Sequence, residues 1–227
     1  MPKLNESQKS DLVAAAKRYA ANYPGSPAQT YMAHRGLGAA LNRYGYVSEP
    51  AVGHERYRNH LAIPYWRPAG GIHAVATIRF RCISDECVRK PDGSYRPVHQ
   101  ERHEGHGKYL GLPGHPPHLH NTSALLTGTP YLALTEGETD DEAASIADVP
   151  AVGTPGVASW RDHFAPAFAG FEVVFALGDG DPAGRAFATR MCELLPNAVA
   201  IDLGDGYDTS RYVQEFGPDA FRERLGL

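Results

Sequence analysis

The feature that most constrains the fold is a regular alternation of short apolar runs and helical stretches in the C-terminal half of the chain. The apolar runs have the length of buried strands and cover residues 131–135, 149–152, 172–177 and 197–203. The stretches that follow them have helical spacing and cover about residues 139–147, 159–168, 182–195 and the C-terminal residues. Alternating elements of these lengths build a parallel sheet with helices on both faces. We therefore predict a Rossmann-like α/β domain over residues 128–227.

The N-terminal half has a different pattern. Residues 5–23 carry apolar side chains at helical spacing, and a second short helix is expected at residues 31–35. Apolar runs at residues 60–65 and 72–80 are expected to form strands, with a turn between them. These elements predict a smaller α+β subdomain over residues 1–127.

The bulk composition excludes several classes of protein. The net charge of −4 argues against a protein that coats nucleic acid through a uniformly basic surface, although a local basic groove is compatible with it. No apolar run is long enough to span a bilayer, and the polar N-terminus does not indicate secretion. The three cysteines do not suggest a disulfide framework, so we expect a cytoplasmic protein.

Carboxylates follow three of the four predicted strands at the point where each strand ends. Glu136 and Asp140 follow the first strand, Asp179 and Asp181 the third, and Asp208 the fourth. The carboxyl ends of parallel strands meet at one edge of a sheet, where open α/β sheets bind their ligands. Carboxylate oxygens are the ligands that Mg²⁺ prefers, and Mn²⁺ binds the same type of ligand. The pattern predicts a site for one or two such ions, of the kind that catalyses phosphoryl transfer.

Some of these acids also have a purely structural interpretation. Asp181 precedes Pro182 and a helix, so it fits an N-cap with proline at the first helical position. Asp140 lies in a first helical turn, where the helix dipole favours acids. Glu136 and Asp179 end apolar strands beside glycine and are not needed as caps, so they are the stronger ligand candidates.

Two of the acidic segments resemble motifs of the TOPRIM domain, which bacterial primases share with type IA and type II topoisomerases and some nucleases. One is the Glu-Gly-x-x-Asp turn at residues 136–140, and the other is the Asp-Gly-Asp at residues 179–181. The resemblance implies a TOPRIM fold for the predicted parallel sheet. The implied catalytic residues and principal metal ligands are Glu136, Asp179 and Asp181, and the acids that complete the cluster are Asp140 and Asp208.

Flanking segments narrow the resemblance to the polymerase core of DnaG-type primases. Five segments are similar to further motifs of these primases and occur in the same order as in the family. They are Arg35-Gly36-Leu37, the Lys-Tyr-Leu segment at 108–110, Gly153-Thr154, residues 179–185 and Asp205-Gly206-Tyr207-Asp208. The similarity runs from about Tyr31 to the C-terminus. It implies a DNA primase, which makes short RNA primers on single-stranded DNA from nucleoside triphosphates by metal-dependent nucleotidyl transfer.

The resemblance also implies which side chains contact nucleic acid or nucleotide. Lys108 would meet a template or nucleotide phosphate, next to Tyr109. Further candidates are Arg79, Arg81, Arg35, Thr154 in a loop whose amides suit a phosphate, and Arg185. A sharp strand-to-helix turn explains the glycines beside Thr154 without a ligand, and Arg185 also suits a surface ion pair.

The sequence departs from the family in several ways. Ser210 stands where the family often has a further acid, which weakens the case for a second metal, and Gly111 replaces an asparagine. The family's zinc ribbon and helicase-binding domain have no counterpart here. We therefore expect a stripped core of the kind that a phage supplies, working in the host cytoplasm with a replicative helicase and a zinc-binding module from other chains.

Two other functions stay open. A TOPRIM nuclease would use the same acids with water as the nucleophile, although it has no need of the segment around Lys108. A degenerate core would hold single-stranded DNA or a helicase without catalysis, which the intact Glu136, Asp179 and Asp181 argue against. A phosphatase of the haloacid dehalogenase type is less compatible, because its Asp-x-Asp lies on an early strand and here the strand of Glu136 comes first.

A polar and irregular insertion at residues 84–107 adds a second candidate metal site. Cys82-x4-Cys87 precedes a group of histidines, and both residue types bind zinc. The histidines of the insertion are His99, His103 and His106. A hairpin with incidental thiols is the alternative in a cytosolic protein. Further histidines among prolines, interpreted as loop residues near nucleic acid, are His115, His118 and His120.

Overall fold

The computed structural model describes residues 4–40 and 44–227, and within this part the chain forms two compact units. The first holds residues 4–34 and 44–116, and the second holds residues 35–40 and 117–227. The sequence places the division after residue 127, whereas the structure joins the segment from residue 117 to the second unit. None of the helices in the described part is long and apolar enough to cross a membrane.

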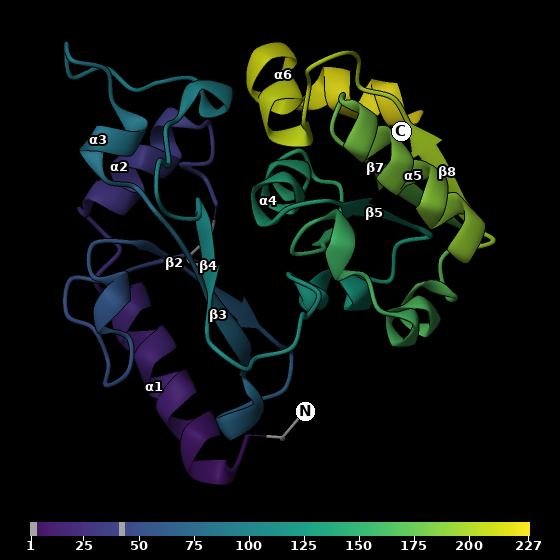
Figure 1. The fold of residues 1–227 in the computed structure, drawn as a ribbon. Coiled ribbons are helices and arrows are strands. Elements are labelled where there is room, and N and C mark those ends of the chain that lie inside the picture. Colours follow the sequence, from purple (N-terminus) through teal and green to yellow (C-terminus); the bar gives the residue numbers. More distant parts are fainter. Residues whose placement is uncertain (1–3, 41–43) are drawn as a thin grey trace. The chain divides into compact units, whose positions relative to one another are not determined.

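Helices α1 and α2 open the first unit (Figure 1). α1 spans Glu6–Ala21 and begins with a capping box, in which the side chain of Asn5 accepts from the amide of Gln8 and the side chain of Gln8 accepts from the amide of Asn5. α2 spans Pro27–His34 and starts earlier than predicted, because Pro27 suits the first turn of a helix. Both predicted helices are therefore present with shifted ends.

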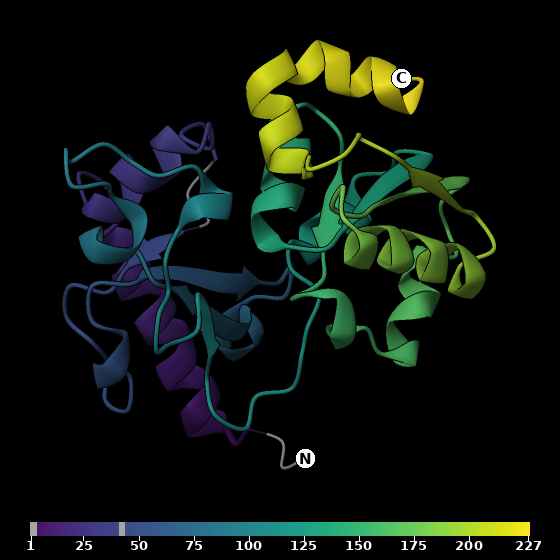
Figure 2. The same ribbon diagram turned by 45° about the horizontal axis from the view of Figure 1, so that its top comes forward.

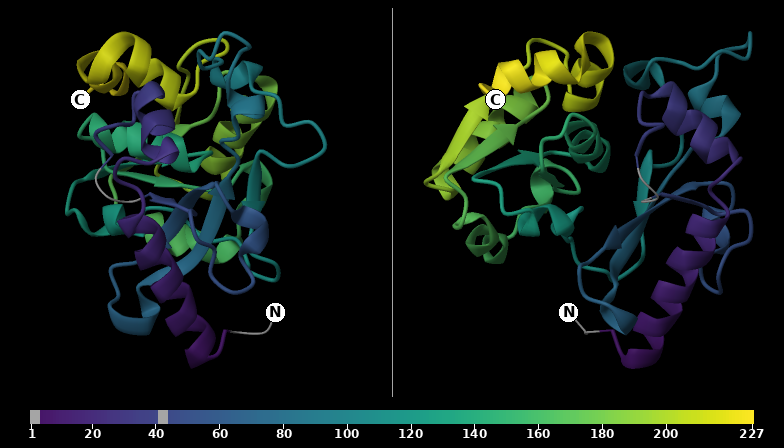
Figure 3. Two further views of the ribbon diagram at one scale, coloured as in Figure 1. Left: turned by 90° about the vertical axis from the view of Figure 1, so that its left-hand side faces the viewer. Right: turned by 180° about the vertical axis from the view of Figure 1, so that it is seen from behind.

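An antiparallel sheet with strand order β1-β2-β3-β4 forms the centre of the first unit. Its strands are β1 (Gly45–Tyr46), β2 (Leu61–Trp66), β3 (Val75–Arg81) and β4 (Tyr109–Gly111). Figure 3 shows α1 running along this sheet, and Tyr19 of α1 meets Phe80 of β3 edge to face. The contact belongs to a buried apolar cluster of helix and strand residues, and such burial is the main driving force for folding.

The segment between β3 and β4 is mostly irregular, as predicted. It contains a short helix, α3 (Asp85–Val88), and a 3-10 turn at Val98–Gln100. A second 3-10 turn at Gly71–His73 precedes β3, so this strand starts later than the sequence suggests.

A parallel sheet with strand order β6-β5-β7-β8 forms the centre of the second unit, which confirms the predicted α/β class. Its strands are β5 (Tyr131–Thr135), β6 (Ala151–Gly153), β7 (Val173–Leu177) and β8 (Ala198–Ile201). Consecutive residues of β5, β6 and β7 are buried, which is expected when both faces of a parallel sheet are covered.

Helices cover both faces of this sheet (Figure 2). α4 (Glu138–Ile146) and α6 (Thr209–Leu225) pack together on one face, and α5 (Pro182–Leu194) covers the other. The core on the α5 face joins side chains of the helix to alternate positions of the strands, among them Phe187, Met191, Leu132, Leu134 and Val174. The alternation follows from the period of two along a strand.

One helical prediction in this unit needs correction, and the predicted C-terminal helix is present with a bend. Residues 159–168 are expected to form a helix, but the chain forms 3-10 turns at Val157–Ser159 and Asp162–Phe168. Pro166 lies inside the second turn and lacks the amide hydrogen that an α-helix needs at this position. α6 bends at Gly217, whose φ of 89° is not helical, and Pro218 follows it.

Candidate active site

The order of the strands in the parallel sheet reverses between its two central strands, β5 and β7. After β5 the chain adds β6 on one side, and it then adds β7 on the other side of β5. Open α/β sheets bind their ligands outside the carboxyl ends of the strands at such a switch point. Glu136 follows β5 directly and Asp179 comes shortly after β7, so the topology brings both acids to this point.

A hydrogen bond links the two strand ends. The backbone amide of Asp179 donates to Oε1 of Glu136 over 3.1 Å. Gly184 of α5 lies against both residues: a Cβ atom at this position would be 2.6 Å from Oε1 of Glu136 and closer still to the backbone of Asp179. Only glycine leaves room here, and this is what lets the carboxylate of Glu136 reach the loop after β7.

The loop after β7 is joined to the loop after β8. The amide of Gly180 donates to the carbonyl oxygen of Tyr207 over 2.7 Å, and the amide of Gly206 donates to the carbonyl oxygen of Gly180 over 2.8 Å. A Cβ atom on Gly180 would collide with the carbonyl oxygen of Gly204. The two loops therefore pack backbone against backbone and hold their acidic residues at one edge of the sheet.

Asp181 and Asp208 are both N-caps of helices. Oδ1 of Asp181 accepts from the amide of Gly184 in α5 over 2.8 Å, and Oδ1 of Asp208 accepts from the amide of Arg211 in α6 over 2.6 Å. The structural interpretation of Asp181 is thus confirmed. A capping bond uses one of several acceptor sites of a carboxylate, so an N-cap is compatible with a second role as metal ligand.

Asp140 lies in the first turn of α4 and is 8% exposed. Its Oδ1 accepts a 3.0 Å hydrogen bond from the amide of Ser210. Burial raises the pKa of Asp140 well above its ordinary value, and the charges of Asp208 and Asp179 raise it further. The charge of Arg35, which is itself buried, offsets part of this rise. The sequence predicts Arg35 as a phosphate contact, and the structure places its charge near the acidic cluster.

The pKa of Glu136 is also raised. Burial is the main cause and the charges of Asp181 and Asp208 add to it, while the hydrogen bond from Asp179 opposes it. A bound divalent cation would relieve repulsion of this kind, because its charge exceeds that of any single neighbour. The acids offer hard oxygen ligands, which suit Mg²⁺ or Mn²⁺. The donor chemistry of these side chains therefore suits such an ion.

Thr154 and Arg185 have different surroundings. Thr154 is fully buried, and its hydroxyl donates to the carbonyl oxygens of Thr135 and Glu136, at 3.4 and 3.3 Å. It thereby fixes the end of β5, from which Glu136 projects. Arg185 lies on α5 with its side chain 48% exposed and pairs with Asp205 at 3.1 Å. This pair is the surface ion pair that the sequence offers as an alternative to phosphate binding.

Arg81 of the first unit is buried within a polar network. Its side chain is 1% exposed and donates to the hydroxyl oxygens of Tyr31 and Tyr109. It also donates to Oε2 of Glu101 over 2.7 Å, and the hydroxyl of Tyr31 donates to Oε1 of the same carboxylate over 2.6 Å. The sequence predicts Arg81 as a phosphate contact, whereas in the structure its guanidinium is occupied by protein partners.

Two other basic candidates lie beside this network. Nζ of Lys108 is 3.9 Å from Oε2 of Glu101, and the side chain of Lys108 is 35% exposed. Arg79 of β3 lies over the ring of Tyr109, with its Cζ 5.1 Å from the ring centroid. Lys108 and Arg79 are both partly exposed, which contact with a phosphate group requires.

The second unit contains a buried ion pair that was not predicted from the sequence. Nδ1 of His120 is 2.7 Å from Oδ2 of Asp141, and both residues are fully buried. Burial alone would lower the pKa of His120, but the charge of Asp141 outweighs it and the pKa is raised. The backbone of His120 also pairs with Gly153. His120 lies outside the named helices and strands, as expected, but its side chain is buried against Asp141, and no spacing in the sequence connects the two residues.

Comparison by sequence finds a phage relative. The Gene 57 protein of Mycobacterium phage D29 is 37% identical to this chain over 171 residues, which make up 74% of this chain and 99% of that protein. No family model matches the chain.

Comparison by structure finds catalytic cores of DnaG primases. The RNA polymerase domain of Mycobacterium tuberculosis primase DnaG matches with a TM-score of 0.70 and 19% identity, over 96% of this chain and 82% of that chain. A DnaG primase catalytic domain bound to single-stranded DNA matches with a TM-score of 0.71 and 19% identity, over 97% of this chain and 79% of that chain. The chain therefore has the fold of the DnaG catalytic core, and the predicted fold is confirmed.

Proposed function

The chain belongs to the family of the Gene 57 protein of Mycobacterium phage D29, and we propose that it is a DNA primase core that synthesises short RNA primers on single-stranded DNA. The observation that carries the proposal is the acidic cluster at the switch point of the parallel sheet, where burial and mutual repulsion raise the pKa of Glu136 and Asp140. The DnaG core fold supports it, since a solved neighbour of this fold is bound to single-stranded DNA.

Glu136, Asp179 and Asp181 would hold a Mg²⁺ or Mn²⁺ ion, with Asp140 and Asp208 completing the cluster. When bound, the ion would neutralise the triphosphate and the charge that develops as a primer 3′-hydroxyl attacks the α-phosphorus. The protein keeps these carboxylates in place before any substrate arrives. The amide of Asp179 orients Glu136, and the capping bonds orient Asp181 and Asp208. Such preorganisation lowers the cost of reaching the transition state.

The partly exposed cations would bind phosphate groups of the template or the nucleoside triphosphate. Lys108 and Arg79 of the first unit are the leading candidates, and Arg185 of the second unit is a further one. Contacts of this type are made to the backbone and carry no sequence information. We therefore expect template binding that weakens as salt rises and depends little on base sequence.

The proposal is tested by incubating the full chain with single-stranded DNA, labelled nucleoside triphosphates and Mg²⁺ or Mn²⁺. Glu136→Gln keeps the size of the side chain and removes its charge, and Glu172→Gln changes an exposed acid of the same unit as a matched control. We expect short, metal-dependent oligonucleotides from the wild type and from Glu172→Gln, and at least about 100-fold less product from Glu136→Gln.

Two results would contradict the proposal. Metal-dependent cutting of the template without nucleotides would identify a nuclease that uses the same acids with water as the nucleophile. A template that is bound but neither copied nor cut, even when a replicative helicase and a zinc-binding module are added, would identify a non-catalytic binding module.

A further inference from the structure

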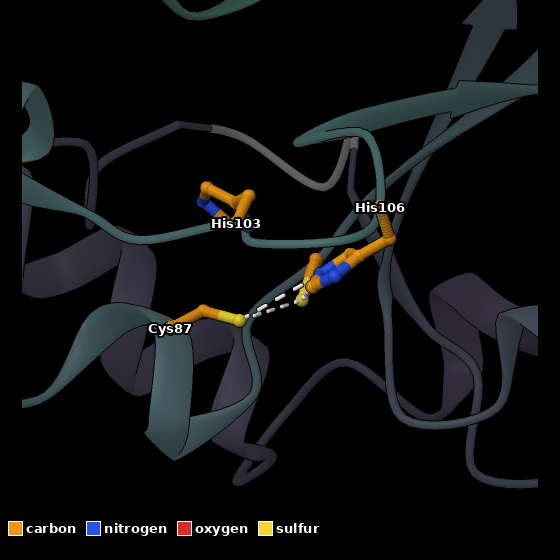
Figure 4. A group of neighbouring side chains, drawn as sticks. Cys87, His103 and His106 are labelled. Carbon is orange, nitrogen blue, oxygen red and sulfur yellow. Dashed lines mark hydrogen bonds between the residues drawn. The ribbon is translucent and has the colours of Figure 1, made fainter.

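Four side chains of types that bind metals converge in the first unit, whereas the acidic cluster belongs to the second unit. Cys82 follows β3, Cys87 lies in α3, and His103 and His106 lie in the segment before β4. One ligand atom from each of the four lies within 4.8 Å of the others. Figure 4 shows Cys87 and His106 pointing toward one another, with His103 beside them.

The distances among Cys82, Cys87 and His106 are close to those of side chains that share a metal, and His103 lies within 4.8 Å of them. Sγ of Cys82 lies 3.7 Å from Sγ of Cys87, and Nε2 of His106 lies 3.2 and 3.6 Å from the two sulfurs. A tetrahedral zinc ion with Zn–S near 2.3 Å and Zn–N near 2.0 Å places two sulfurs about 3.8 Å apart and a sulfur and a nitrogen about 3.5 Å apart. Disulfide sulfurs are only about 2.05 Å apart, and both cysteines are free thiols here.

The hydrogen bonds of the histidines leave one ring nitrogen of each available for a metal. Nδ1 of His106 donates to the carbonyl oxygen of Glu104 over 3.2 Å, so Nε2 keeps its lone pair. Nε2 of His103 donates to Oε2 of Glu101 over 3.2 Å. Nδ1 of His103 is buried and has no hydrogen-bond partner within the described part of the chain. Metal-bound histidines commonly donate their other ring nitrogen to a carboxylate or carbonyl in this way.

Burial and charge also favour a metal over a pair of incidental thiols. Cys82 and Cys87 are 3% and 5% exposed, and the side chain of His103 is 9% exposed. His106 is exposed, so the group is buried on the side of the two cysteines and open to solvent at His106. Two thiolates, two neutral imidazoles and a divalent cation together carry no net charge, so the complete site is compatible with this partly buried position. If the two thiols were together by chance, there would be no reason for two histidines beside them to have one ring nitrogen hydrogen-bonded and the other available for a metal.

We propose that this group binds one Zn²⁺ ion in a closed, structural Cys₂His₂ site, with the ligands Cys82, Cys87, His103 and His106. Because all four coordination positions are filled by the protein, the ion would have no open position for a substrate. It would close the insertion between β3 and β4 into a loop. His103 is bonded to Glu101, which in turn lies beside Lys108. The zinc site would thus fix the approach to Lys108, and only this last consequence rests on the proposed function.

The site is tested by measuring metal in the full chain, expressed with added zinc and purified with reduced thiols. Mass spectrometry of metals should find one zinc per chain in the wild type. Cys82→Ser, Cys87→Ser and His106→Gln should each lose at least about 10-fold of the bound zinc after dialysis, since each removes a ligand. The matched controls Cys192→Ser and His99→Gln, which lie outside the group, should keep it.

A second measurement on the wild type does not depend on how well the variants fold. Co²⁺ added to the zinc-free chain should give the absorption of a tetrahedral ion with thiolate-to-cobalt charge transfer, which carboxylate ligands cannot produce. Glu136→Gln should leave both the zinc content and this spectrum unchanged. Failure of the wild type to take up zinc or cobalt with its thiols reduced would overturn the proposal. Equal zinc in Cys82→Ser and the wild type would do so as well. Neither result depends on primer synthesis.

Discussion

Asp179 and Glu136 are joined through the backbone of one and the side chain of the other, since the amide of Asp179 donates to Oε1 of Glu136. Asp179 thus serves the acidic cluster with its main chain as well as with its carboxylate. The position of the Glu136 carboxylate depends on the path of the loop after β7. Changes that disturb this loop should therefore impair the site even where no candidate ligand is replaced.

Gly184→Ala tests this dependence. The added Cβ atom would lie 2.6 Å from Oε1 of Glu136, which forces the carboxylate or the loop to move. The Cβ atom would lie closer still to the carbonyl oxygen of Asp179, so the loop itself must shift. A displacement of about 1 Å in a catalytic group costs on the order of 100-fold in rate, and we expect primer synthesis to fall by at least about this factor. Gly170→Ala is the control, because a Cβ atom there meets nothing within 4 Å. Equal rates for the two variants would show that Glu136 is not held by this contact.

Asp181 combines two roles that substitution can separate. Asparagine caps a helix about as well as aspartate, so Asp181→Asn should leave the free energy of unfolding nearly unchanged while it lowers metal-dependent synthesis. Asp181→Ala should lower synthesis and also cost about 1 kcal/mol of stability. Urea unfolding and primer synthesis on the same preparations check this. Full activity in Asp181→Asn would mean that Asp181 is a cap alone.

The ion pair of Arg81 and Glu101 should contribute strongly to the stability of the first unit. Both side chains are 1% exposed, so Glu101→Ala leaves a buried cation without its partner, at a cost of about 3–5 kcal/mol. Asp85→Ala breaks the pair with Arg89, in which the side chain of Asp85 is 80% exposed, and should cost less than about 1 kcal/mol. Denaturant unfolding of both variants measures the difference, and similar values would contradict a buried network.

The pair of His120 and Asp141 predicts a pH dependence. The folded chain raises the pKa of His120 above its ordinary value of 6.5, so it favours the protonated ring. The stabilisation is fully present below about pH 6.5 and is lost as the pH rises through the folded pKa. The stability difference between the wild type and His120→Gln should therefore shrink with rising pH, as thermal unfolding across the pH range can measure. A constant difference for His120→Gln across the pH range would exclude the charged pair.

The parallel sheet and its acidic edge could be predicted because both depend on short stretches of neighbouring residues in the sequence. Each strand is a continuous apolar run, as burial on both faces requires. Glu136 and Asp179 stand beside glycine where such runs end, so the geometry of a parallel sheet brings them together. Residues 159–168 have the apolar spacing of a helix, but the effect of Pro166 on the backbone outweighs it.

The contacts that were not predicted join segments far apart in the chain. His120 and Asp141 are separated by 21 positions, and Arg81 and Glu101 by 20. The periodicity of apolar residues shows which face of a helix or strand a residue lies on. It carries no information on which distant residue will pack against that face. Arg81 illustrates this, because an arginine on an amphipathic strand is expected at the surface and here three oxygen-bearing side chains surround it.

The contact between the loops after β7 and β8 has a consequence for how this edge of the sheet can change. A side chain can adopt another rotamer when its neighbour is altered, but Gly180 and Gly204 meet through their main chains, which have no such freedom. We therefore expect a displacement of one loop to displace the other. Under the proposed function, a change of metal or substrate would therefore come from exchanging the acids on an unchanged frame. The glycines of this frame carry no functional group, yet they are expected to be among the positions that tolerate mutation least.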